Sequence, residues 1–233
     1  MYKELKREAY EANMEIPKLE LAIYTFGNVS AFDSAAGVLA IKPSGVDYEK
    51  LDASMMVLVD LDGKIIEGDL RPSSDTKTHI VLYSKFAGIN GVCHTHSTYA
   101  TAWAQAAIPV PILGTTHADF LSMEIPVTDF MPDGKIKNNY EEETGYQIIN
   151  AFAELNPSEI QMTLVAGHGP FCWGGSAAKA VYHAKVLEEI SKMAYLTMQI
   201  NPRTSSLKRT LIDKHYQRKH GKDAYYGQDK KGE

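Results

Sequence analysis

The sequence predicts an α/β domain with three layers, α/β/α, around a central and largely antiparallel sheet. Three observations support this prediction: short strand-like runs, a hairpin turn between two of them, and amphipathic segments with helical spacing before and after them. The chain has 233 residues, 44% hydrophobic and 23% charged, which is enough for one sizeable core. We therefore expect a single domain over residues 1–228 and a frayed, charged tail over residues 229–233.

The first third of the chain is expected to form a helix and then strands. Residues 2–16 carry apolar side chains at helical spacing, and Pro17 should stop that pattern. Asp62-Gly63 has the composition of a hairpin turn, which should lead into a strand over Lys64–Glu67. The strands expected before this turn are Leu21–Phe26, Val38–Ile41 and Met56–Leu61.

Helices are expected to dominate from residue 75 onward. Residues 75–87 have a helical pattern, and Ser97 can cap a short helix through Gln105. Ser176 should cap the longest helix, whose apolar stripe comprises Ala180, Ala184, Leu187, Ala194 and Met198. A last helix is expected from about Ser205 to Gly221, a residue suited to a left-handed cap.

Composition and charge exclude several functional classes. The net charge of −5, without a dominant basic stripe, argues against a nucleic-acid binder. No stretch approaches the ~18 apolar residues of a membrane span, and the first residues do not resemble a secretory signal. Cys93 and Cys172 lack the spacing of a thiolate zinc site or a disulfide framework, so we expect a cytoplasmic protein.

The segment Gly91-Val-Cys-His-Thr-His-Ser97 contains the most informative pair of residues, His94 and His96. The apolar residues before them indicate a buried strand, and side chains two apart on a strand project from the same face. Imidazole nitrogens are suitable ligands for Zn, Fe, Ni or Cu. Alone, this pair is equally consistent with a structural role.

A third histidine, His168, follows another apolar run, Met162–Val165. Gly167 and Gly169 on either side allow the backbone to turn and approach closely. A three-histidine site that leaves coordination positions open is typical of a catalytic metal centre.

Three polar turns are suited to an anion, because phosphate is bound by backbone amides, hydroxyls and one or two cations that converge on it. Taken singly, each turn is also consistent with an ordinary loop or helix cap. The turns are Gly27-Asn-Val-Ser30, Lys42-Pro-Ser-Gly45 and Pro72-Ser-Ser-Asp-Thr76.

Further motifs are Gly114-Thr-Thr-His-Ala-Asp119, His168-Gly-Pro-Phe171, Lys214-His-Tyr-Gln-Arg-Lys-His-Gly221 and Tyr225-Tyr-Gly-Gln228. With these motifs, the three turns and His94-Thr-His96, the chain resembles the class II aldolase/adducin superfamily and, within it, the branch of L-ribulose-5-phosphate 4-epimerases. The resemblance covers about residues 1 to 228. It implies a cyclic homotetramer with active sites shared between subunits, a sugar phosphate as substrate, and no nucleic-acid or membrane partner.

The resemblance also implies one divalent metal per subunit, expected to be Zn²⁺, held by His94, His96 and His168. Related aldolases carry a glutamate base where this chain has Asp75. In the epimerases the residue at this position lies near or on the metal instead, so the resemblance implies that Asp75 is a fourth metal ligand. Its position is equally consistent with a helix N-cap. The residues implied for phosphate and substrate binding are Asn28, Lys42, Ser44, Gly45, Ser73, Ser74, His215 and Arg218, the last two from a neighbouring subunit.

The implied reaction interconverts L-ribulose 5-phosphate and D-xylulose 5-phosphate at C4, which is not acidic because it is not adjacent to the carbonyl. The C3–C4 bond would break by retro-aldol cleavage, and the aldehyde would rotate and add back through its opposite face. The resemblance assigns Asp119 and Tyr226 as the two proton carriers. From position alone, Asp119 is consistent with a capping acid, Tyr226 with packing, and His215 and Arg218 with a solvated helix face.

Two alternatives remain at this stage. One is a class II sugar-phosphate aldolase of the L-fuculose or L-rhamnulose phosphate type. The other is a non-catalytic, adducin-like binding module, which would not need the three histidines. The sequence leaves open whether L-arabinose or L-ascorbate utilisation is served. His79, His117 and His183 are expected to be structural or surface residues.

Overall fold

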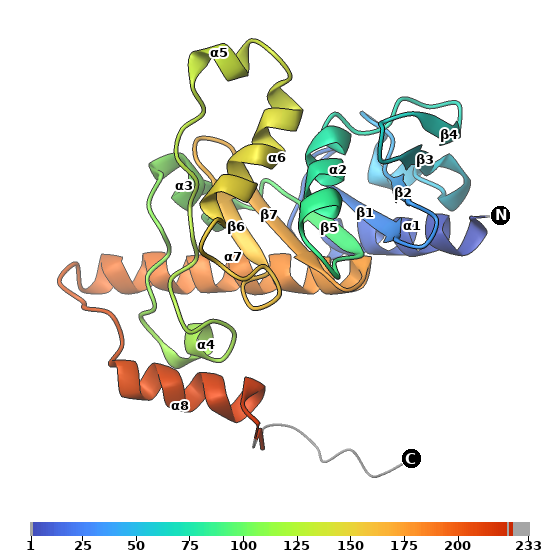
Figure 1. The fold of residues 1–233 in the computed structure, drawn as a ribbon. Helices are drawn as coiled ribbons and strands as arrows, with labels where there is room; N and C mark the ends of the chain where they lie inside the picture. Colours follow the sequence, from blue (N-terminus) through green and yellow to red (C-terminus); the bar gives the residue numbers. More distant parts are fainter. Residues whose placement is uncertain (1, 223, 226–233) are drawn as a thin grey trace.

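The computed structural model describes residues 2–222, 224 and 225, and it confirms the predicted three-layer fold (Figure 1). The sheet of the described residues has seven strands in the order β4-β3-β2-β1-β5-β7-β6, and each pair of neighbours is antiparallel. The strands are β1 (Asn28–Asp33), β2 (Val38–Ile41), β3 (Val57–Asp60), β4 (Ile65–Glu67), β5 (Gly91–His94), β6 (Met162–Val165) and β7 (Gly169–Gly174). The predicted tail, residues 229–233, lies outside the described part.

Helices cover both faces of the sheet (Figure 1). The long helices α1 (Lys3–Lys18) and α7 (Ala177–Ile200) pack on one face, and α2 (Thr76–Lys85) and α6 (Tyr140–Ala151) pack on the other. The remaining helices are η1 (Tyr48–Lys50), η2 (Ala53–Met55), α3 (Thr98–Ala106), α4 (Thr115–Ala118), α5 (Asp133–Ile136) and α8 (Arg209–His220). Among the described helices, none is long and apolar enough to cross a membrane.

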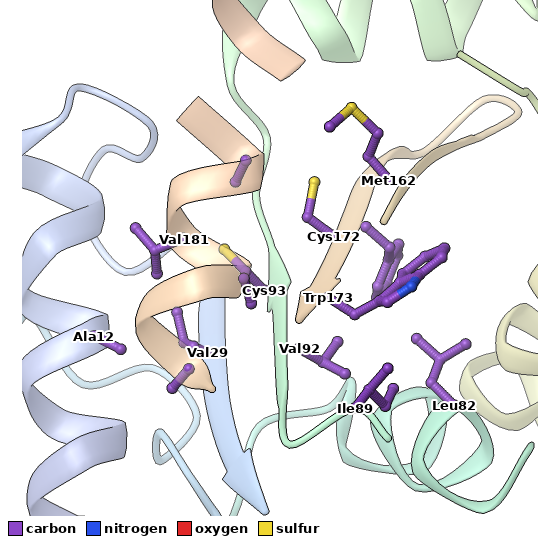
Figure 2. Close-up of a cluster of buried hydrophobic side chains, with 14 of the residues drawn as sticks. Ala12, Val29, Leu82, Ile89, Val92, Cys93, Met162, Cys172, Trp173 and Val181 are labelled. Carbon is purple, nitrogen blue, oxygen red and sulfur yellow. The ribbon is translucent and has the colours of Figure 1, made fainter. Parts of the chain in front are cut away.

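The two faces of the central strands each carry apolar side chains, so the core lies on both sides of the sheet. Figure 2 shows Cys93 directed toward Val181 of α7, whereas Val92 lies on the side of Trp173. Trp173 is fully buried, and its indole N–H donates to the carbonyl of Pro157 at 2.8 Å. Strands that are buried on both faces do not alternate between apolar and polar residues. This explains why the central strands appear in the sequence as short, continuous apolar runs.

The predicted strand Leu21–Phe26 is wrong, because the first strand is β1. The side chains of Ile23, Tyr24 and Phe26 are 63%, 79% and 52% exposed, so this part of the run lies on the surface, although Leu21 is buried. β1 has polar residues at its start, and from the sequence Gly27-Asn-Val-Ser30 is interpreted only as an anion-binding turn and not as the beginning of a strand. The hairpin at Asp62-Gly63 is confirmed, since the amide of Asp60 donates to the carbonyl of Lys64 at 3.0 Å.

Three helix ends differ from the predictions. α1 passes through Pro17 and ends at Lys18, so the proline lies inside the last turn instead of stopping the helix before it. α8 begins at Arg209 rather than near Ser205. Gly221 caps it with φ −71°, which is not left-handed.

The predicted helices at residues 75–87, after Ser97 and after Ser176 correspond to α2, α3 and α7. The hydroxyl of Ser176 accepts a hydrogen bond from the amide of Lys179 at 3.2 Å, as expected of an N-cap. Met198, assigned to the buried stripe of α7, is instead 37% exposed.

Replacing Gly91 by alanine should destabilise the fold, because Gly91 at the start of β5 lies against the backbone that opens α7. A Cβ atom there would overlap main-chain atoms of Ser176 and Ala177, which cannot move without shifting the helix. We expect a loss of about 1–3 kcal/mol in the free energy of unfolding, measured by urea denaturation. Gly175→Ala is the control, since nothing lies within 4 Å of its added Cβ. Equal stability of the two variants would contradict this packing.

Candidate active site

A cavity of about 510 Å³ lies at the ends of the central strands β1, β2, β5 and β7, where several chain segments meet. It brings together all three polar turns and all three predicted histidines, which are far apart in the sequence. The lining residues are Thr25, Phe26, Gly27, Asn28, Lys42, Pro43, Ser44, Gly45, Ser73, Ser74, Asp75, His94, His96, Tyr140, Glu141 and His168. The predicted association between the anion-binding turns and the histidines is therefore present within one protomer.

The three histidines form a cluster in which one nitrogen from each ring lies within 4.8 Å of the others. The Nε2 atoms of His94 and His96 are 3.1 Å apart. The ring of His168 is 4.7 Å from that of His94 and 5.2 Å from that of His96, centroid to centroid. His94 ends β5, whereas His96 lies just beyond the strand and His168 lies in the turn between β6 and β7.

A backbone hydrogen bond orients the ring of His94. Its Nδ1 lies 2.9 Å from the carbonyl oxygen of Pro170, and a carbonyl can only accept, so the proton is on Nδ1. The lone pair on Nε2 is then directed toward His96. This is the arrangement by which proteins commonly orient a metal-binding imidazole.

Electrostatics favour the neutral form of two histidines of the cluster, His96 and His168. Burial, together with the nearby His94, lowers the pKa of His168 to about 4. Burial and the same neighbour also lower the pKa of His96. Neutral imidazoles have the lone pairs that a metal ion requires.

Asp75 lies in the same cavity but outside the cluster of three histidines. Its carboxylate accepts a hydrogen bond from the side-chain amide of Asn28 at 2.6 Å. Burial opposes ionisation, but the neighbouring histidines and this hydrogen bond outweigh it and lower the pKa of Asp75. Although Asp75 precedes α2, its side chain makes no capping hydrogen bond within the described structure. The N-cap interpretation is therefore not supported, and the metal-ligand role remains a prediction.

Lys42 supplies a buried positive charge to the cavity. The side chain is 2% exposed, and its Nζ lies 3.4 Å from the carbonyl of Thr25 and 3.5 Å from that of Pro43. Burial lowers the pKa of Lys42 to about 8, which leaves it mostly charged at pH 7. A buried ammonium beside the hydroxyls and glycine of the three turns favours an anion.

Four cavity residues are not among those predicted from the sequence: Thr25, Phe26, Tyr140 and Glu141. The hydroxyl of Tyr140 lies 3.4 Å from Nδ1 of His168, so it can help to orient that ring. Both Tyr140 and Glu141 open α6, a helix that the sequence pattern did not indicate. The only signal was the acidic run Glu141-Glu-Glu143, which is typical of a helix N-terminus.

Asp119, His215 and Arg218 form a second cluster, which does not line the histidine cavity of the same protomer. Nδ1 of His215 lies 2.9 Å from Oδ1 of Asp119, and Arg218 donates to both carboxylate oxygens at 3.0 and 2.7 Å. Burial opposes ionisation here as well, but the hydrogen bonds from Arg218 and His215 lower the pKa of Asp119. α8 lies beside α4 at the lower edge of Figure 1.

The remaining residues considered in the sequence analysis are Tyr226 and the three histidines outside the cluster. Tyr226 lies outside the described residues. His79, His117 and His183 are structural: each ring forms a hydrogen bond within the fold, to the Ser30 hydroxyl, the Met123 carbonyl and the Trp173 carbonyl.

Comparison with known proteins defines the class to which this fold and site belong. Residues 7–195 match the family model of the class II aldolase and adducin N-terminal domain. This match covers most of the chain, and the protein therefore belongs to the class II aldolase and adducin family.

Within the family, the chain is 48% identical over 224 residues to the L-ribulose-5-phosphate 4-epimerase UlaF of Salmonella paratyphi C (strain RKS4594), covering 96% of this chain and 98% of that protein. The UlaF protein of Salmonella choleraesuis (strain SC-B67) matches to the same extent.

Among solved structures, an L-fuculose 1-phosphate aldolase has a TM-score of 0.76 at 23% identity, with 91% of this chain and 94% of that chain covered. The L-fuculose-1-phosphate aldolase of Thermus thermophilus has a TM-score of 0.65 at 22% identity, with 87% and 98% covered. At these identities the two structures support the shared fold alone.

Replacing Lys42 by methionine should weaken anion binding without lowering the stability of the fold. Removal of a buried charge is expected to leave the melting temperature at pH 7 unchanged or higher, while the affinity for inorganic phosphate falls roughly 10–100-fold. Because the folded-state pKa is near 8 and the ordinary value is 10.5, only the wild type should gain stability as the pH rises between these values.

Calorimetric titration with phosphate and thermal unfolding measure the two effects of Lys42→Met. The control is Lys50→Met, which removes an exposed lysine paired with Asp47 at 2.9 Å. Wild-type phosphate affinity in the Lys42 variant would contradict the role given to this residue.

Proposed function

We propose that this protein is an L-ribulose-5-phosphate 4-epimerase that acts as a single domain over residues 1–228. It interconverts L-ribulose 5-phosphate and D-xylulose 5-phosphate by retro-aldol cleavage and re-addition. The observation that carries this proposal is the 48% identity, over nearly the whole length of both chains, to proteins of that name. The cavity supports it, because it combines three histidines with anion-binding turns.

The residues of the cluster fit a divalent metal ion, for which we propose zinc, one per subunit. Three neutral imidazoles and no thiolate leave positions open for substrate, as in catalytic zinc sites. The Nε2 separation of 3.1 Å between His94 and His96 is close to the ~3.4 Å expected for two nitrogens at tetrahedral positions around zinc. When bound, the ion would supply Lewis acidity toward the oxygens of the ketose.

The other cavity residues hold the substrate. Lys42, with Ser44, Gly45, Ser73 and Ser74, binds the phosphate, which keeps the cleaved aldehyde fragment in place while it rotates. Asn28 orients Asp75 through their hydrogen bond and leaves its own carbonyl oxygen, buried and without a partner in the described residues, for the substrate. Asp75 lines the same cavity and interacts electrostatically with His94 and His168, so we assign it as an additional ligand.

Proton transfer at C4 requires an acceptor on one face of the aldehyde and a donor on the other. We assign these roles to Asp119 and Tyr226: one takes the C4 hydroxyl proton when the C3–C4 bond breaks, and the other returns a proton after re-addition. Since Asp119 does not line the cavity of its own protomer, it must act at the site of a neighbour. This supports a homotetramer with shared active sites, in which His215 and Arg218 accompany Asp119. We place the enzyme in the cytoplasm.

The direct test is a coupled assay for D-xylulose 5-phosphate on L-ribulose 5-phosphate, before and after metal removal by a chelator. We expect activity to be lost with the metal and restored by Zn²⁺, and His96→Asn to lose both bound metal and activity. His183→Asn is the control, because its ring bonds to the carbonyl of Trp173 away from the cavity. Free glycolaldehyde phosphate as the main product would instead favour an aldolase, and activity unaffected by chelation would contradict the metal role.

The shared site can be tested by complementation between two inactive variants. His96→Asn lacks the metal cluster and Asp119→Asn lacks the proton carrier, so each homo-oligomer should be inactive. When the two chains are co-expressed with different tags and purified on both tags, some sites combine intact histidines from one chain with an intact Asp119 from the other. Activity should reappear in these mixed oligomers. No gain over the separate variants would show that each site is formed within one chain.

A further inference from the structure

We propose that Glu188 of α7 is a positioning residue for the metal-binding His96. The inference rests on the proposed function, because it concerns the same metal centre. Glu188 is in the middle of α7, is 8% exposed, and does not line the cavity. Its two carboxylate oxygens accept hydrogen bonds from the backbone amides of Tyr99 at 3.0 Å and Ala100 at 2.9 Å.

These two amides belong to the first turn of α3, where amide groups have no partner within the helix. Ser97 occupies the N-cap position, yet its side chain makes no capping hydrogen bond in the described structure. Glu188 therefore caps α3 from another helix. A carboxylate at this end also interacts favourably with the helix dipole.

The capped turn begins directly after the segment that carries His96. On the other side of His96, the backbone is held by β5, where His94 pairs with Phe171 and the amide of Thr95 donates to Pro170 at 3.4 Å. The His94–Ser97 segment is thus a short connection between two fixed points. One is the sheet, and the other is the α3 terminus held by Glu188.

The position of His96 depends on this backbone more than on contacts of its own ring. His96 is exposed, unlike His94, and the contacts of its ring are with its two fellow ligands and with the ring of Phe26 at 6.2 Å. His94, in contrast, is buried, stacked on Phe171 at 4.1 Å and bonded to a carbonyl. A change at the α3 terminus should therefore reach the metal centre through His96.

A second contact makes the α3–α7 pair a rigid support. The indole N–H of Trp103 donates to the carbonyl of Ser191 at 3.0 Å, one turn after Glu188. With this contact intact, α3 should remain packed on α7 when Glu188 is changed. The expected effect is a small displacement of the first turn rather than loss of the helix.

The test measures zinc affinity rather than activity, by competition with a chromophoric chelator on metal-depleted protein. Glu188→Gln keeps the size of the side chain but replaces one acceptor oxygen by an NH₂ group. This donor would face the N–H of Tyr99 or Ala100, so one of the two capping hydrogen bonds would be lost. We expect its zinc affinity to fall roughly 10–100-fold, the range found when residues that orient metal ligands are changed. Glu188→Asp keeps the charge on a shorter side chain and should fall between this variant and the wild type.

The matched control is Glu8→Gln. Glu8 also caps a helix from a distance, with one carboxylate oxygen accepting a hydrogen bond from the amide of Ala177 at 3.0 Å at the start of α7. Both glutamine variants should lower the melting temperature of the metal-free protein, but only Glu188→Gln should lower zinc affinity. Equal zinc affinity in wild type and Glu188→Gln, or an equal loss in both variants, would overturn the positioning role. A wild-type chain that binds no zinc would overturn the metal assignment itself.

Discussion

The antiparallel register between β5 and β7 is the constraint on which the site depends. It pairs His94 with Phe171 and so brings the turn that contains His168 to the end of β5. The bond between His94 and the Pro170 carbonyl belongs to the same pairing and orients the ring. A shift of one residue would direct the His94 side chain to the other face of the sheet, away from the cavity. The convergence of the three histidines is thus a consequence of strand pairing.

The cavity has two electrostatically different regions: the histidine cluster, which is suited to a cation, and the surroundings of Lys42, which are suited to an anion. Burial lowers the pKa values of His96 and His168, which favours the neutral imidazoles that a cation requires. Lys42 remains mostly charged and faces the anion-binding turns. Asp75 lines the same cavity, accepts a hydrogen bond from Asn28 and has a lowered pKa, so it adds a negative charge. A substrate with a polar keto end and a phosphate end matches this division.

The sequence was most informative where chemistry requires a particular residue type. Histidines and polar glycine-bearing turns identified the cavity correctly because few other residues provide those ligands. Prediction from sequence failed where burial determines the structure. Leu21–Phe26 has the composition of a strand, but its side chains from Ile23 to Phe26 are largely exposed, and the polar residues at the start of β1 conceal the actual strand. Tyr140 could not be assigned, since it reaches the cavity only through the packing of α6 on α2.

The separation of Asp119 from the histidine cavity illustrates a further limit of sequence reasoning. Both belong to motifs of one family, but motifs do not indicate whether residues meet within one chain or between chains. In the described protomer Asp119 is engaged by His215 and Arg218 on α8. This pairing keeps the carboxylate ionised and oriented, as a proton acceptor for a neighbouring site would require.

The central claim is that three imidazoles converge on one metal ion in this cavity, and X-ray absorption spectroscopy of the zinc-loaded protein tests it most directly. We expect one zinc per chain with about three imidazole nitrogens at ~2.0–2.1 Å, and oxygen ligands in the remaining positions. A spectrum with sulfur ligands, or with oxygen ligands and no imidazole, would contradict it.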